Sequence, residues 1–283
     1  MTPPPATIPF VKMQGIGNDF VMLDTITDPL PDLDLAALSR RTNDRRRGIG
    51  GDGLILVEPG EREPFRMRMF NPDGSESEMC GNGIRCFARL LKDHGHLDGQ
   101  VARVETGAGV LELDLQPDGQ VRVDMGIAQL DPAKIGMAAG VSQSLGGAPF
   151  QDAPIGGYRG TAVSMGNPHV VIFTDDVAAV DLESAGPELE RSPFFPARVN
   201  VHFAQVLSRG ELRMRTWERG AGITLACGTG ACAVAVAASV TGRADRDVLL
   251  HLPGGDLRIE IADDLRVHMT GPAQTVFRGE LTL

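Results

Sequence analysis

Apolar positions in this chain recur in short strand-like runs, and few stretches are long enough for a helix. In the first half, these runs occupy residues 54–58, 65–70, 109–115 and 120–125. In the second half, they occupy residues 163–173, 201–207, 211–217, 248–251, 257–261 and 266–269, and a last run follows at 275–283. Glycine-containing turns separate the runs. The pattern predicts a protein built mainly from short strands.

Three segments instead favour a helix: residues 35–43, 83–95 and 230–242. The last two each follow a cysteine and end on a glycine, which is typical of a helix C-terminus. Residues 231–238 are apolar on every face, whereas a surface helix keeps one polar side. We therefore expect strands to enclose this helix, and we predict a sheet or barrel wrapped around a central helix in each half of the chain.

The two halves of the chain repeat each other. The sequence RMRMF at 66–70 matches RMRTW at 213–217, and ten residues later each copy reaches a cysteine, Cys80 or Cys227, followed by Gly-x-Gly. Both matches have an offset of 147 residues, which indicates a duplicated domain.

The predicted fold is therefore α/β, with two homologous strand-rich domains related by pseudo-two-fold symmetry. We place the first domain at residues 1–126 and the second at 127–271, and we expect residues 272–283 to return to the first. The Gly-, Ala-, Ser- and Pro-rich stretch 127–160 is the expected crossover.

The composition of the chain disfavours several classes of function. The 283 residues include 27 basic and 37 acidic side chains, and the net charge of −10 disfavours a nucleic-acid or anionic-membrane binder. No apolar run approaches about 18 residues, so no membrane-spanning helix is expected. Residues 1–5 lack the pattern of a secretory signal, so we expect a cytoplasmic protein whose four cysteines are thiols.

Cys80 and Cys227 are candidates for acid and base chemistry. A thiol at the start of a helix faces unpaired amides and the positive end of the helix dipole, so both thiols are expected to be acidified. If duplication sets the two thiols face to face, they share one proton, because one thiolate opposes ionisation of the other. One group then removes a Cα proton while the other supplies a proton to the opposite face. This chemistry inverts a stereocentre.

Several ordered motifs resemble those of diaminopimelate epimerase, and the resemblance runs nearly end to end. The motifs are Gly15-x-Gly17-Asn18-Asp19-Phe20, Phe70-Asn71-Pro72-Asp73-Gly74-Ser75, Cys80-Gly81-Asn82-Gly83-Ile84-Arg85-Cys86, Gly166-Asn167-Pro168-His169, Trp217-Glu218-Arg219-Gly220, Ala226-Cys227-Gly228-Thr229-Gly230 and Gly271-Pro272-Ala273. The resemblance implies a homodimeric enzyme that converts LL-diaminopimelate into the meso isomer, in lysine and peptidoglycan precursor synthesis. It also implies that the enzyme needs no pyridoxal phosphate, other cofactor or metal. The presence of only three lysines is compatible with this.

The resemblance further implies individual roles. Cys80 and Cys227 are the acid and base, and His169 and Glu218 tune their ionisation. The helix starts bind the reacting carboxylate through Gly81, Asn82, Gly228 and Thr229. The other residues hold the second amino acid end of the substrate, which carries both charges: Asn18, Asn71, Asn167, Asn200, Glu218 and Arg219. These asparagines stand beside Gly or Pro in several motifs, which equally suits turns. Gly53 replaces a Gln found in some members, so one side-chain contact is absent.

Other patterns are weaker. Residues 48–53 match G-x-G-x-x-G, but a strand-like run follows them where a dinucleotide site needs a helix. The arginines at 45–47 are interpreted as a solvated surface. Cys86 and Cys232 are expected in the core. The cysteine spacings lack the close pairs of a zinc site and the six histidines are not expected to cluster into ligand sets, so no metal site is predicted.

Two alternatives stay open. One is a sibling racemase of the same fold, acting on proline, hydroxyproline or histidine. The Glu218-Arg219 pair favours a substrate with a distal zwitterion, and Asn82 stands where proline racemases usually have histidine. The other is a redox or binding protein in which Cys80 and Cys227 form a reversible disulfide.

Overall fold

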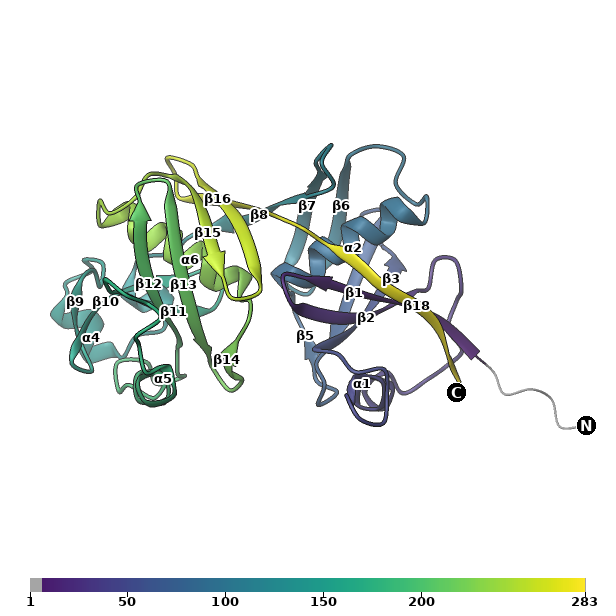
Figure 1. Cartoon of the computed structure of the whole chain (residues 1–283), viewed down its shortest axis with the longest axis horizontal. Coiled ribbons are helices and arrows are strands. Elements are labelled where there is room, and N and C mark those ends of the chain that lie inside the picture. Colours follow the sequence, from purple (N-terminus) through teal and green to yellow (C-terminus); the bar gives the residue numbers. More distant parts are fainter. Residues whose placement is uncertain (1–6, 283) are drawn as a thin grey trace, which may run out of the picture. The chain divides into compact units, whose positions relative to one another are not determined.

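The structure is a computed structural model that describes residues 7–282 (Figure 1). Residues 1–6 and 283, which belong to the predicted domains and the last predicted strand, lie outside the described residues. The chain divides into two compact units. Unit 1 comprises Met1–Val123 and Gly271–Leu283, and unit 2 comprises Asp124–Thr270.

Unit 1 contains one mixed sheet and two helices. Its strands are β1 (Thr7–Gly15), β2 (Asn18–Asp24), β3 (Gly53–Pro59), β4 (Phe65–Phe70), β5 (Glu76–Ser77), β6 (Val101–Thr106), β7 (Gly109–Leu115), the first residues of β8 (Val121–Ile127) and β18 (Gln274–Thr282). Its helices are α1 (Leu35–Asn43) and α2 (Gly81–Asp93). The strands pair in the order β18–β1–β2–β3–β4–β6–β7–β8, with β5 beside β4. The pairs β2–β3 and β4–β6 are parallel, and the other pairs are antiparallel.

The described part of unit 2 has the same arrangement with two additional short helices, α3 and α4. Its strands are β9 (Ala153–Ile155), β10 (Tyr158–Ser164), β11 (Pro168–Phe173), β12 (Asn200–Ser208), β13 (Glu211–Glu218), β14 (Gly222–Thr224), β15 (Asp247–Leu252), β16 (Gly255–Ile261) and β17 (Arg266–Gly271). Its helices are α3 (Pro132–Ile135), α4 (Ala139–Ser144), α5 (Leu182–Glu190) and α6 (Gly228–Val240). The strands pair in the order β9–β10–β11–β12–β13–β15–β16–β17, and here β11–β12 and β13–β15 are the parallel pairs.

The repeat predicted from the sequence is confirmed by the strand registers. In unit 1, Phe20 on β2 pairs with Gly53 on β3, and in unit 2, His169 on β11 pairs with Asn200 on β12. The equivalent helices α2 and α6 have 13 residues each. The strand-rich α/β class is therefore confirmed.

Helix α6 is enclosed, as its all-apolar sequence predicts. Every residue from Gly230 to Ala238 is buried, and the helix contacts β10, β11, β12, β13, β15 and β16. Figure 1 shows the strands of unit 2 around this helix. Its side chains are mostly Ala and Val, so the surrounding strands approach its backbone closely and hold its N-terminus in a fixed place.

One predicted strand is wrong. Residues 163–173 form two antiparallel strands, β10 and β11, rather than a single one. Gly166 has a φ of 94°, a left-handed conformation that reverses the chain between the strands. Among the described residues, no helix is long and apolar enough to cross a membrane.

Candidate active site

Cys80 and Cys227 occupy the same position in the two units. Cys80 is the N-cap of α2 and Cys227 is the N-cap of α6, and both have extended backbone angles, with φ of −137° and −133°. The amides of the following first turn have no partner within the helix. The predicted placement of both thiols at a helix start is confirmed.

Around Cys80, the structure brings together Asn18 and Asn82. The Cys80 thiol donates to Asn18 Oδ1 at 3.7 Å, and Asn82 Nδ2 donates to the same oxygen at 3.1 Å. Asn18 Nδ2 donates to Asp52 Oδ2 at 2.7 Å, which determines the orientation of the Asn18 amide. The Asn18 oxygen therefore faces the thiol.

Three charged residues, Arg45, Asp52 and Asp19, support this arrangement, a role that the sequence did not predict. Arg45, on the surface as expected, pairs with both Asp52 and Asp19 at 2.8 and 2.6 Å. Burial raises the pKa of Asp19, but hydrogen bonds from Arg45 and Lys12 outweigh it and hold that pKa at about 2. Asp19 and Arg45 thus remain charged and anchor Asp52 beneath Asn18.

Asn71 forms hydrogen bonds within its own turn. Its Nδ2 donates to Ser75 Oγ at 3.0 Å, and its carbonyl accepts from the Gly74 amide at 2.9 Å. Its side chain has no hydrogen bond to Cys80, Asn18 or Asn82. The geometry of Asn71 therefore agrees with the alternative expectation, that this residue stabilises a turn.

Around Cys227, the structure brings together Thr229, Glu218 and Asn167. Thr229 Oγ1 lies 3.8 Å from Cys227 Sγ, and Asn167 Nδ2 donates to Thr229 Oγ1 at 3.4 Å. The Glu218 carboxylate, whose charge acts on the thiol, accepts from Thr224 Oγ1 at 2.6 Å.

The expectation that both thiols are acidified is wrong for Cys227. The residue is only 5% exposed. Burial raises its pKa well above the ordinary value, and the charge of Glu218 raises it further, while the Gly230 amide and the Thr229 hydroxyl oppose these effects. The acidifying influence expected at a helix start is outweighed by desolvation.

Glu218→Gln is expected to lower the pKa of Cys227, because the variant removes the nearby negative charge and leaves the burial unchanged. The measurement is the pH dependence of alkylation of Cys227 by a small neutral reagent, in a Cys80→Ala background. We expect faster alkylation at neutral pH than in the parent. Glu211→Gln, at the other end of the same strand, β13, is the control. An identical pH profile for the Glu218 variant would contradict the assigned influence of its charge.

Asn200 and Arg219 form a second polar group in unit 2. Asn200 Oδ1 accepts from the Arg219 amide at 2.9 Å, and Asn200 Nδ2 donates to the Pro168 carbonyl at 3.2 Å. The Arg219 guanidinium donates to the Ala197 carbonyl at 3.0 Å. Asn200 therefore ties the chain after β13 to the start of β11.

His169 is fully buried and lies beside a residue that sequence reasoning missed. Its Nε2 is 2.8 Å from Asn167 Oδ1, and its Nδ1 is 2.8 Å from Nε2 of His202. Burial lowers the pKa of His169 well below its ordinary value, with a smaller contribution from His202. His202 stands two residues after Asn200, between the apolar Val201 and Phe203, and a histidine flanked by apolar residues in a strand was the available signal.

The inner cysteines are in the core, as expected. Cys86 and Cys232 are both fully buried. Burial raises the pKa of Cys86 to about 12. This thiol therefore stays protonated, in keeping with a packing role.

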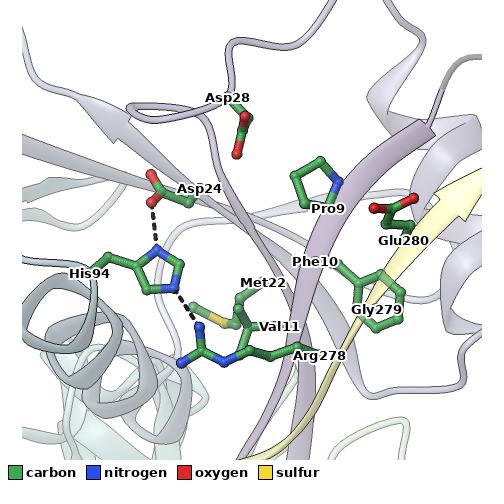
Figure 2. A pocket seen from close by; sticks show the side chains of 10 residues that line it. All are labelled: Pro9, Phe10, Val11, Met22, Asp24, Asp28, His94, Arg278, Gly279 and Glu280. Carbon is green, nitrogen blue, oxygen red and sulfur yellow. Dashed lines mark hydrogen bonds and ion pairs between the residues drawn. The ribbon is translucent and has the colours of Figure 1, made fainter.

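The expectation that the histidines do not cluster is wrong for two of them. His94 Nδ1 and His96 Nε2 lie 2.7 and 2.8 Å from Asp24 Oδ2. The three candidate ligand atoms lie within 4.8 Å of one another. Asp24 and His94 line a pocket of about 370 Å³ in unit 1, between β1, β2 and β18 (Figure 2).

The contacts of this cluster fit a hydrogen-bonded network better than a metal site. Arg278 Nη1 lies 3.2 Å from His94 Nε2, and a guanidinium can only donate. His94 Nε2 is therefore the acceptor, which leaves Nδ1 as the N–H that donates to Asp24 (Figure 2). A metal on Nδ1 would require the opposite tautomer and would place a second cation near Arg278.

Asp24 is expected to stabilise unit 1 in a pH-dependent way. Burial raises its pKa, but hydrogen bonds from His94, His96 and Thr27 outweigh it and lower that pKa from 3.8 to about 2. A lowered pKa in the folded state gives a contribution that is present above pH 3.8 and is lost as the pH falls through about 2. The shift corresponds to about 2 kcal/mol.

The test compares urea denaturation of the wild type and Asp24→Asn. The difference in unfolding free energy is expected to be about 2 kcal/mol at neutral pH and to shrink toward zero near about pH 2. Asp28→Asn, which changes an exposed carboxylate at the same pocket, is the control. A difference that does not depend on pH would contradict the assignment.

Comparison with known proteins settles the family. A family model described as diaminopimelate epimerase matches residues 10–130 and 161–276. This chain belongs to the diaminopimelate epimerase family. The resemblance predicted from the motifs is confirmed.

Relatives within the diaminopimelate epimerase family match nearly the whole chain. A diaminopimelate epimerase from Moorella thermoacetica is 53% identical, over 97% of this chain and 99% of the relative. One from Geobacillus kaustophilus is 44% identical, over 95% of each. A solved hydroxyproline epimerase from Agrobacterium vitis has a TM-score of 0.66 at 17% identity, over 98% of this chain and 93% of that chain. Likeness at that identity shows a common fold alone.

Proposed function

We propose that this protein is an amino acid epimerase that interconverts LL- and meso-diaminopimelate without pyridoxal phosphate, metal or other cofactor, in lysine and peptidoglycan precursor synthesis. One observation carries the proposal: each repeated unit presents a thiol at the N-cap of its buried central helix. Relatives that are 53% and 44% identical over nearly the full length bear the corresponding name.

The two thiols exchange one proton with the substrate. One thiolate takes the Cα proton, so that the C–H bond breaks, an S–H bond forms and the electron pair stays on the Cα–carboxylate unit. The opposing thiol gives its proton to the other face of Cα and becomes a thiolate. Because burial and Glu218 raise the pKa of Cys227, this residue holds the proton at neutral pH. Cys80 is then the base in the direction in which Cys227 donates.

The first turns of α2 and α6 would bind the reacting carboxylate. Their amides point out of the helix start without intrahelical partners, and the helix dipole favours negative charge there. Charge that develops on the carboxylate as the C–H bond breaks is stabilised by the same donors. The residues concerned are Gly81, Asn82, Gly228 and Thr229.

The distal amino acid end would be held by the asparagines and by Arg219. A guanidinium recognises a carboxylate, and amides supply both donors and acceptors. The influence of the Glu218 charge on the pKa of Cys227 favours a role in setting the protonation of the thiol over contact with the distal ammonium. Asn18 and Asn167 are the proposed amides nearest to the thiol groups, and Asn71 and Asn200 complete the set.

Solvent-deuterium exchange at Cα tests the function. Under reducing conditions, the protein is expected to incorporate deuterium into LL-diaminopimelate and to form the meso isomer. Proline, hydroxyproline and histidine, the substrates of sibling racemases, are the comparison substrates, and preferential exchange with one of them would replace diaminopimelate as the substrate. Failure to exchange any of these protons when fully reduced would favour a redox or binding role for the cysteine pair.

The setting of the enzyme is also part of the proposal. A cytoplasmic location would keep both thiols reduced. We expect a homodimer, which sedimentation of the purified protein would test.

A further inference from the structure

A chain of buried polar groups runs through unit 2 behind the proposed substrate-binding residues. His169 on β11 and His202 on β12 are both fully buried, and their rings are joined by a 2.8 Å contact between His169 Nδ1 and His202 Nε2. At one end, Thr216 Oγ1 lies 3.0 Å from His202 Nδ1. At the other, His169 Nε2 lies 2.8 Å from Asn167 Oδ1.

Both imidazoles are neutral, because burial lowers the pKa of His202 to about 3 and that of His169 well below its ordinary value. Each ring then has one N–H and one acceptor nitrogen. Asn167 donates its Nδ2 to Thr229, so its Oδ1 accepts from His169 Nε2.

The orientation of the Asn167 amide determines the direction of the other hydrogen bonds in this series of polar groups. His169 Nδ1 must accept from His202 Nε2, and His202 Nδ1 must accept from the Thr216 hydroxyl. Each group in the series therefore donates to the next in one direction, from Thr216 through both histidines to Asn167.

The equivalent positions in unit 1 are apolar. The parallel registers match Phe20 to His169 and Ile55 to His202. Both Phe20 and Ile55 are fully buried. The fold therefore does not need imidazoles at these positions, and their presence in unit 2 alone indicates a task beyond packing.

Gly230 makes room for His202 beneath α6. A Cβ built on Gly230 would lie 2.3 Å from His202 Cε1, a clash that a buried ring cannot avoid. In unit 1, the nearest atom to a Cβ on the equivalent Gly83 would be the end of the Ile55 side chain, at 2.7 Å. The imidazole of His202 thus packs directly against the first turn of the helix that Cys227 caps.

We propose that His202 is a positioning residue, which holds His169 in the Nε2–H tautomer and thereby orients the Asn167 amide toward Thr229 and the substrate. This inference rests on the proposed function for the role of Asn167, but the hydrogen-bond chain itself can be tested without any substrate.

The first experiment determines the tautomers by two-bond ¹H–¹⁵N correlation NMR of the full-length protein. In the wild type, we expect both rings to have N–H at Nε2. His202→Ile places at this position the residue that unit 1 has there, and it removes the donor to His169 Nδ1. We expect the His169 ring to change to the Nδ1–H form or to a mixture. His251→Gln, which removes a surface histidine bonded to Glu211 and Asp256, is the control. An unchanged His169 tautomer in His202→Ile overturns the proposal.

The second experiment separates KM from kcat for diaminopimelate. His202→Ile is expected to raise KM about tenfold, as when one ordering hydrogen bond is lost, and to change kcat by less than about threefold. His202→Gln, whose amide can still donate to His169, is expected to restore KM to within about threefold of the wild type. Thr216→Val, which removes the hydroxyl at similar volume, is expected to change KM in the same direction and by less.

The possible results distinguish the positioning role of His202 from the proposed function of the protein. A changed tautomer with an unchanged KM overturns the positioning role, and so does a His202→Gln variant that is no better than His202→Ile. If His202→Ile does not fold, Thr216→Val and His202→Gln carry the same tests. A wild type with the expected tautomers but no exchange on diaminopimelate would refute the proposed function and leave the hydrogen-bond chain standing.

Discussion

Cys80→Ala and Cys227→Ala are each expected to lower the rate of epimerisation by about 10²–10⁴-fold, the contribution of one positioned acid or base. Inversion needs one group on each face of Cα, and a single remaining thiol supplies only one of them. That thiol can still remove and return a proton on its own face. Each single variant is therefore expected to exchange deuterium into one stereoisomer without inverting it.

The measurement follows both chirality and deuterium content of diaminopimelate with time. The double variant should lose exchange as well as inversion. Cys86→Ala is the matched control, because this buried thiol lies on α2, the helix that Cys80 caps. The variant is expected to retain turnover and to lose about 1 kcal/mol of stability. A single variant at either N-cap that kept full turnover would contradict the two-thiol mechanism.

Gly230→Ala is expected to have the second largest effect. The new methyl group would lie 2.3 Å from His202 Cε1 and 3.0 Å from Cys227 Sγ, so the ring, the thiol or the helix must move. Overpacking of this kind costs about 1–3 kcal/mol of unfolding free energy. A shift of about 1 Å in the thiol is expected to lower kcat by about 10²-fold.

Urea denaturation and steady-state kinetics measure the two effects. Gly83→Ala is expected to be milder, because its nearest neighbour is the end of the Ile55 side chain. Gly140→Ala in α4 has no atom within 4 Å of the new methyl group and is expected to leave stability the same or slightly higher. Wild-type stability and turnover in Gly230→Ala would show that the space between Gly230 and His202 can hold a methyl group, and would contradict the prediction.

The sequence predicted the features that depend on local pattern or on repetition. The offset of 147 residues revealed the duplication, and the all-apolar segment around Ala233 predicted an enclosed helix. The thiols were placed at helix starts because each cysteine precedes glycines and a helical segment. Local patterns and repeated motifs are both visible in a sequence without knowledge of which distant residues touch.

What the sequence did not predict depends on contacts between distant residues. His94 and His96 meet Asp24 from about 70 positions away. His202 lies beside His169 because two parallel strands pair, and neither strand shows this on its own. The acidification of Cys227 was wrong for the same reason, since desolvation and the Glu218 charge come from the folded surroundings.

The last strand has a consequence for how the protein is made. β18 pairs with β1, at the opposite end of the chain, and completes unit 1 (Figure 1). On the ribosome, β18 emerges only after all of unit 2 has been synthesised. Unit 2 has every strand it needs before then, whereas the nascent unit 1 must wait with an open sheet edge along β1. Translation order thus favours completion of the second unit first, and the nascent chain is most exposed to aggregation at that edge.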